Sequence, residues 1–177
     1  MPSISYPKLI FAAVLSLYFF SIAYDPMVDG MWNFLSIVDL PIHETGHLLF
    51  RPFGEFISVA MGSGFQILVP IIFVGYFIWH EQLYSAWIVL FWVGQSILNV
   101  WVYAADAVVM QLVLTSGMTG NEGSFHDWNY LLSVTGLMSS VDTIAGFIRI
   151  IGTLVILAAC ALSVYYSIYP AESEQSL

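Results

Sequence analysis

The chain has 177 residues, of which 59% are hydrophobic and only 8% are charged. An average soluble domain carries about 25% charged residues, so this composition excludes a soluble globular protein. With only 3 Lys and Arg residues to meet phosphates, it also excludes a nucleic-acid partner. The composition instead predicts an all-α, polytopic membrane protein whose partner is the lipid bilayer.

Apolar segments and the turn-forming residues between them divide residues 1–177, which we interpret as a single membrane-embedded domain. We expect, in chain order, a first span at 8–24, a helix at 31–50, a third span at 65–79, a long helix at 83–114, a loop at 115–127, a short helix at 128–138 and a last helix at 142–169. Residues 56–64 contain glycine and are expected to link the second helix to the third. The segment 128–138 is too short to cross a hydrocarbon core of about 30 Å, so it is expected to be re-entrant or interfacial. The prediction is four to five transmembrane helices plus this short helix.

The first apolar run has two interpretations. Ser21-Ile22-Ala23 is similar to the cleavage site of a signal peptide, although the positively charged region that precedes such a peptide is weak. Lys8 followed by about 17 apolar residues is typical of a membrane span. We favour the span.

The orientation in the membrane is predicted from the few cationic residues. Lys8 precedes the first span, which favours a cytoplasmic N-terminus. Alternating spans then place Arg51 and Arg149 on the same side. On this path the end of the second helix, the end of the long helix and the loop at 115–127 meet near the cytoplasmic face. We therefore expect the polar residues of these three places to converge there.

The segment His43-Glu44-Thr45-Gly46-His47 has the pattern H-E-x-x-H inside the second apolar helix. On a helix the two histidines lie on one face and can bind one Zn²⁺ ion through neutral imidazoles. Glu44 is then expected to act as the general base that takes a proton from the zinc-bound water. The structural alternative is a pair of core histidines bonded to the backbone, but unpaired polar groups at membrane depth are costly without a metal or water. The motif therefore predicts a catalytic zinc site.

A catalytic zinc site needs a third protein ligand, and two residues could supply it. Asp106 follows a polar stripe on the long helix, where an unpaired carboxylate would be costly. His126 is the better ligand by residue type and lies in a loop that could fold over the site. Asp127 is expected either to cap the next helix or to hold the other ring nitrogen of His126. The residues alone do not rank Asp106 and His126.

The polar stripe consists of Gln95 and Asn99, which lie on one helical face with Asp106. Either amide could donate a hydrogen bond to a substrate or to an oxyanion. The alternative is that they hydrogen-bond between helices and hold the bundle together.

These motifs together resemble the site-2-protease-like intramembrane zinc metallopeptidases, of which the chain would be a divergent member. The resemblance covers about residues 31–107. Asn99 and Asp106 match the order of a family Asn and the Asp that completes the zinc site, and Gly62-Ser63-Gly64-Phe65-Gln66 occupies the place of the family's glycine-rich element. Asp106 is followed by Ala107 rather than by the family's glycine, and the segment 126–129 has no counterpart in the family pattern.

The resemblance implies a zinc metalloprotease, a hydrolase that cleaves membrane proteins or peptides in or next to the bilayer. Two other functions fit the same residues. A non-catalytic membrane protein could use the metal as a sensor or structural centre, and a transporter could use its intramembrane acids as an ion path. A structural metal site is closed by four protein ligands, whereas a catalytic site keeps one position open.

Overall fold

The computed structural model describes residues 4–27 and 33–170 of the chain, so the start of the helix expected at 31 lies outside the described residues. The described part contains helices and no strand, with α1 Tyr6–Tyr24, α2 Leu35–Phe50, α3 Glu55–Trp79, α4 Leu83–Ala105, α5 Asp127–Val134 and α6 Val141–Ile168. Short 3₁₀ turns lie at Arg51–Phe53, Gly120–Glu122 and Met138–Ser140. The predicted all-α fold is confirmed.

Four helices among the described residues are long and apolar enough to cross a membrane: α1, α3, α4 and α6. The fifth apolar helix, α2, has 16 residues and is therefore about 24 Å long at 1.5 Å per residue. It is shorter than a hydrocarbon core of about 30 Å, and α5 is shorter still. The four candidate spans among the described residues lie at the lower end of the predicted four to five.

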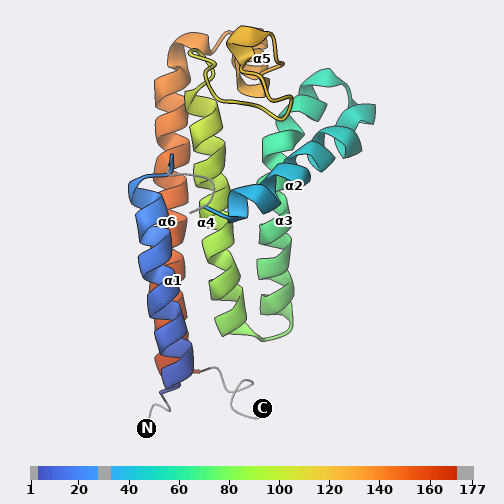
Figure 1. Ribbon diagram of the computed structural model, residues 1–177. Helices are drawn as coiled ribbons and strands as arrows, with labels where there is room; N and C mark the ends of the chain where they lie inside the picture. The colour runs from blue at the N-terminus through green and yellow to red at the C-terminus, as the bar shows by residue number, and fades with distance from the viewer. Residues whose placement is uncertain (1–3, 28–32, 171–177) are drawn as a thin grey trace.

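The long helices run side by side, with α4 between α3 on one side and the pair α1 and α6 on the other (Figure 1). Their core contains Phe19 on α1, Phe91 and Leu98 on α4, and Ile156 on α6, all buried. The backbones of α4 and α6 approach closely at Gly94, where an added Cβ would lie 3.1 Å from the Ile156 nitrogen. Glycine at this crossing permits the tight packing that membrane helices use in place of a hydrophobic driving force.

The polar motifs lie together at one end of this bundle. Helix α2 crosses α3 obliquely and ends at the same level as the end of α4, and α5 lies above the end of α4 (Figure 1). The expected convergence of the second helix, the long helix and the loop is therefore present in the structure.

The segment 56–64 is helical, so the prediction of a linker there is wrong. It forms the first turns of α3, which packs against α2 at Gly46. An added Cβ on Gly46 would meet the backbone carbonyl of Met61. Gly62, where an added Cβ would meet His43 and His47 of α2, thus belongs to a close helix crossing rather than to a turn, and sequence composition does not distinguish the two.

The long helix expected at 83–114 ends at Ala105, nine residues early. The Asp106 carboxylate accepts hydrogen bonds from the backbone N–H groups of Gln111, at 2.9 Å, and Leu112, at 3.0 Å. These bonds offer the backbone a turn in place of the helix, as short acidic side chains commonly do. Met110 lies in the left-handed region at φ 51°, which is incompatible with a continuing helix.

The predicted orientation assumed that the second helix crosses the membrane and returns to the side of Lys8. In the structure the start of α1 lies beside the end of α6, where the Ser5 N–H donates to the Ser167 carbonyl at 2.9 Å. The end of α2, followed by Arg51, lies at the opposite end of the bundle (Figure 1). The expectation that Lys8 shares a face with Arg51 and Arg149 is wrong. Helix α2 is too short to span, and Arg149 lies in the half of α6 that begins at the end opposite Lys8.

Candidate metal centre

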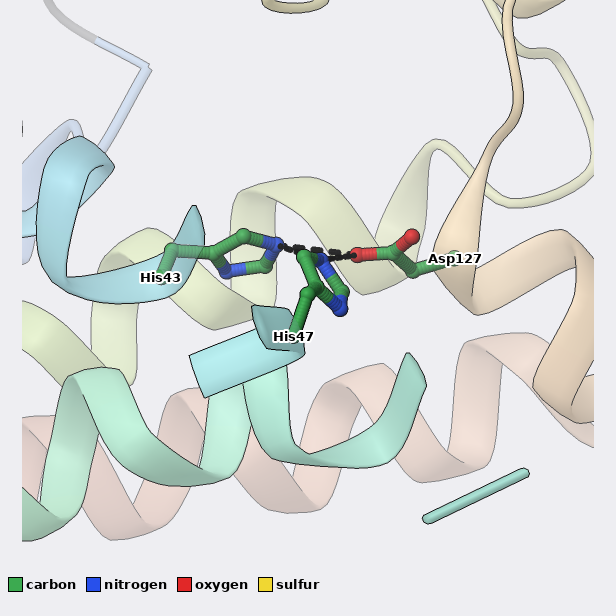
Figure 2. A group of neighbouring side chains, drawn as sticks. All are labelled: His43, His47 and Asp127. Carbon is green, nitrogen blue, oxygen red and sulfur yellow. Dashed lines mark hydrogen bonds and ion pairs between the residues drawn. The ribbon is translucent and has the colours of Figure 1, made fainter. Parts of the chain in front are cut away.

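The two histidines of the H-E-x-x-H motif lie one turn apart on α2, and both rings point toward Asp127, the first residue of α5 (Figure 2). Asp127 Oδ2 lies 2.9 Å from His43 Nε2 and 3.0 Å from His47 Nε2. The two Nε2 atoms are themselves 3.0 Å apart. Three potential ligand atoms thus form a nearly equilateral triangle and make up the group within the described residues that could hold a metal ion.

The outer nitrogen of each ring has a partner that determines what Nε2 can do. His47 Nδ1 lies 2.9 Å from the Ser58 carbonyl oxygen, which can only accept a hydrogen bond. His43 Nδ1 lies 3.2 Å from Gln66 Oε1, also an acceptor. Both rings therefore carry their proton on Nδ1 when neutral, and both Nε2 lone pairs face the Asp127 carboxylate.

Three acceptor atoms that face one another at about 3 Å need a cation between them. A tetrahedral zinc site with bonds of about 2.0–2.1 Å has ligand atoms roughly 3.3 Å apart, so the group would open by only a few tenths of an ångström to hold the ion. Gly62 on α3 leaves the necessary space, because a Cβ there would lie 2.6 Å from His47 Nε2 and 2.7 Å from His43 Nε2. The residues present fit a metal ion.

The local charges are consistent with this interpretation. Burial alone would raise the pKa of Asp127, but hydrogen bonds from His43 and His47, formed when a ring takes up a proton at Nε2, hold that pKa below its usual value. The Asp127 carboxylate, as hydrogen-bond partner, raises the pKa of His47. The site therefore keeps an ionised carboxylate and attracts positive charge, whether a proton or a metal ion.

Glu44 does not join the three ligand atoms but lies on the wall of an adjoining cavity of about 670 Å³. His43, His47 and Asp127 line the same cavity, so the group opens onto it. The walls also include apolar side chains from α2, α4 and the segment 112–115, namely Leu40, Val100, Val102, Leu112, Val113 and Leu114. A carboxylate, a group that could hold a metal and space for a substrate or water thus occur together.

Asp106 and His126, expected as metal ligands, pair with each other in the structure: His126 Nε2 lies 3.3 Å from Asp106 Oδ2. His126 Nδ1 accepts the Asn129 N–H at 3.2 Å, so His126 is the N-cap of α5. Burial lowers the pKa of His126, which keeps the ring neutral and able to accept this bond. Both interpretations of Asp127 are wrong: His126 itself caps the helix, its other ring nitrogen pairs with Asp106, and Asp127 faces the motif histidines.

Further contacts fix Asp127 in place, and no motif in the sequence indicates them. The Tyr103 hydroxyl accepts the Asp127 N–H at 3.0 Å, and its ring lies against His126 with centroids 4.4 Å apart. The Trp128 indole N–H donates to Ser63 Oγ at 3.1 Å. These contacts hold helix α5 against both α3 and α4, and so fix the position of Asp127.

The two amides of the polar stripe separate in the structure. Asn99 lines the cavity, in reach of whatever occupies it. Gln95 is fully buried and donates to Asn33 Oδ1 at 3.0 Å, so it ties α4 to the turn before α2 rather than lining the cavity. The substrate-binding role expected for Gln95 is therefore not the one its contacts favour.

Comparison of the chain with models of protein families, with characterised proteins and with solved structures finds no match in any of the three.

Proposed function

We propose that this chain is a multi-pass membrane zinc metallopeptidase that hydrolyses peptide bonds of membrane-associated substrates. The single observation that carries the proposal is the convergence of His43, His47 and Asp127 on a cavity that also has Glu44 in its wall. This is the residue set that an H-E-x-x-H motif needs for catalysis: two imidazoles, one further ligand and a free carboxylate.

An open cavity beside a three-ligand group favours catalysis over a structural role. A structural zinc site is closed by four protein ligands, whereas a catalytic site has three and leaves one position for water or substrate. The described residues bring three ligand atoms together, and the open side is the cavity of about 670 Å³. Two imidazoles and one carboxylate suit Zn²⁺, which is why we prefer it to Ca²⁺ or Mg²⁺.

Each residue then has a separate task. A bound Zn²⁺ would supply a Lewis acid and lower the pKa of a coordinated water. Glu44 accepts the proton of the attacking water and passes it to the leaving amine. Asn99, on the α4 side of the cavity, donates a hydrogen bond to the substrate backbone or to the developing oxyanion.

The proposal places the site near the cytoplasmic face. Arg51 directly follows α2 at the end of the bundle that carries the site, and Arg149 lies in the half of α6 that begins at this end. Lys8 is the cation of the opposite end. Two cations against one favour the site end as the cytoplasmic one under the positive-inside rule.

The test is the Glu44→Gln variant of the full chain, reconstituted in lipid vesicles with quenched fluorescent transmembrane peptides. We expect the variant to keep the zinc content of the wild type and to lose cleavage by at least about a hundredfold, because an amide cannot accept the proton. Asp142→Asn, an exposed carboxylate at the start of α6, is the control and should cleave normally. Zinc-loaded wild-type protein that cleaves no peptide would favour a sensor or structural role instead.

A further inference from the structure

The buried carboxylate that the proposed reaction does not use is Asp39, one turn before His43 on α2. Asp39 is fully buried. Neutral donors surround it: the Trp92 indole N–H at 2.8 Å, Ser96 Oγ at 3.1 Å and Gln66 Nε2 at 3.4 Å, with the amides of Asn99 and Gln95 beside them. An ionised carboxylate only accepts hydrogen bonds, which fits the indole and the amide N–H group. A carboxyl group at this depth requires an explanation, since burial of an acid in a bundle interior is costly. Burial raises the pKa of Asp39, and the hydrogen bonds from Trp92 and Ser96 oppose that rise.

Gln66 connects this carboxylate to the metal centre. Its Nε2 faces Asp39 Oδ2, and its Oε1 faces His43 Nδ1 at 3.2 Å. A side-chain amide can be turned end for end, so its orientation follows from its neighbours. With a carboxylate on one side, the N–H₂ group must face Asp39, and the carbonyl oxygen is then left to face His43.

The orientation of the amide in turn decides the tautomer of His43. Opposite the Gln66 carbonyl oxygen, His43 Nδ1 must carry the proton and donate it. His43 Nε2 then has a free lone pair toward His47 and Asp127, as a metal ligand requires. The opposite amide orientation would place a donor against Nδ1 and favour a proton on Nε2, which blocks coordination.

We infer that Asp39 and Gln66 are positioning residues that lock His43 in its metal-binding tautomer through a carboxylate–amide–imidazole relay. The inference rests on the proposed metal centre. Ser96 and Trp92 on α4 hold the carboxylate in place for this task.

The relay predicts that the carboxylate and the amide can exchange places. In Asp39→Asn the new N–H₂ group opposes that of Gln66, so Gln66 turns and the tautomer of His43 is no longer fixed. In Gln66→Glu two carboxylates face each other. When both substitutions are combined, the amide introduced on α2 donates to the carboxylate introduced on α3, and that carboxylate accepts from His43 Nδ1. The double variant therefore again fixes the proton of His43 on Nδ1, with the carboxylate now at position 66 instead of position 39.

The experiment measures Zn²⁺ affinity of the purified full chain by competition with a chromophoric chelator, together with the visible spectrum of the Co²⁺-loaded protein. We expect each single variant to bind Zn²⁺ at least about tenfold more weakly, the lower bound for loss of an outer partner of a metal ligand. The double variant should return to an affinity near that of the wild type and regain its Co²⁺ spectrum. The exposed Asp142→Asn, at the start of α6 and outside the relay, is the control and should bind as the wild type does.

Two results would overturn the relay alone. One is a Zn²⁺ affinity in Asp39→Asn equal to that of the wild type. The other is a double variant whose loss of Zn²⁺ affinity equals the product of the losses in the two single variants. If Asp39→Asn yields too little folded protein, Gln66→Leu breaks the same relay. It should weaken Zn²⁺ binding at least about tenfold, and unchanged affinity would contradict the inference. A wild-type chain that binds no Zn²⁺ would instead overturn the metal centre itself, so the two failures are distinguishable.

Discussion

Gly62 of α3 lies directly against His47 of α2, so closely that an added Cβ would fall 2.6 Å from the ring Nε2. The same added atom would lie 2.7 Å from His43 Nε2. Since these two nitrogens are the atoms that would bind the metal, the missing side chain of Gly62 forms part of the site. Gly46 on α2 lets the two helices approach closely enough for this contact, because a side chain at position 46 would collide with the backbone carbonyl of Met61.

The first prediction concerns this space. Gly62→Ala should weaken Zn²⁺ binding by at least about tenfold, because the new methyl group must push one or both imidazoles out of the triangle with Asp127. The measurement is chelator competition on the purified protein. Gly75→Ala on the same helix is the matched control, since an added Cβ there meets nothing within 4 Å and alanine favours a helix. Equal Zn²⁺ affinity in the two variants would contradict a metal site at this position.

The second prediction concerns the ligand set. His43→Ala, His47→Ala and Asp127→Ala should each reduce bound zinc to background in elemental analysis, because each removes one of three ligand atoms. The exposed His80, in the turn after α3, offers a matched control, and His80→Ala should keep the zinc content of the wild type. A full complement of zinc in any of the three ligand variants would remove that residue from the site.

The third prediction distinguishes Asp127 from its neighbours. His126→Ala and Asp106→Ala should weaken Zn²⁺ binding about tenfold, the smaller loss expected when a ligand keeps its atom but loses its support. His126 caps α5, and Asp106 holds His126, so both act on Asp127 through the position of the helix. If His126→Ala lost all of its zinc while Asp127→Ala kept some, the assignment of Asp127 as the third ligand would be wrong.

The helices, and the placement of both motif histidines on one helical face, could be predicted from sequence because both depend on local patterns. Hydropathy over about 20 residues determines whether a segment can cross a bilayer, and a four-residue spacing places two histidines on one helical face. The convergence of His43 with the loop that contains Asp127 is present, but the path that predicted it is wrong, because that path required α2 to cross the membrane and α2 has only 16 residues.

The third ligand could not be ranked because His126 and Asp127 are adjacent in sequence and point in different directions. His126 has an extended backbone, with φ −112° and ψ 108°, and its ring returns to Asp106. Asp127 begins the helix, and its carboxylate faces α2. Which of the two neighbouring side chains faces the site depends on the residue at which α5 begins. The ends of a helix are predicted from sequence less accurately than its presence.

The segment 56–64 illustrates a different difficulty. Glycine there is compatible with a turn, yet Gly62 and its neighbours form a helix because α2 crosses α3 at that level. The requirement for small side chains comes from a helix packed against this one, so the composition of the segment alone does not indicate it.

The fourth prediction tests the packing of the long helices separately from the metal. Gly94→Ala should lower the free energy of unfolding by about 1–3 kcal/mol, the range for overpacking a tight interface. The added Cβ would lie 2.6 Å from Ile156 Cγ1 and 3.2 Å from the Gly152 carbonyl oxygen, and the backbone cannot move aside easily. Gly146→Ala on α6 meets nothing within 4 Å and is the control. Thermal unfolding in detergent should show a lower midpoint for Gly94→Ala alone, with Zn²⁺ affinity unchanged.

The last prediction concerns orientation. If the end of the bundle that carries the site is cytoplasmic, cysteines at Ser116 and Ser124 should resist a membrane-impermeant thiol reagent in intact cells and react after permeabilisation. The buried native thiol is removed by Cys160→Ala. Gln82→Cys, between α3 and α4 at the opposite end of the bundle, is the matched position and should react from outside. The opposite pattern would mean that Lys8 marks the cytoplasmic end. That result would leave the metal centre intact but move it to the outer face, and candidate substrates would then be sought among segments exposed on that side.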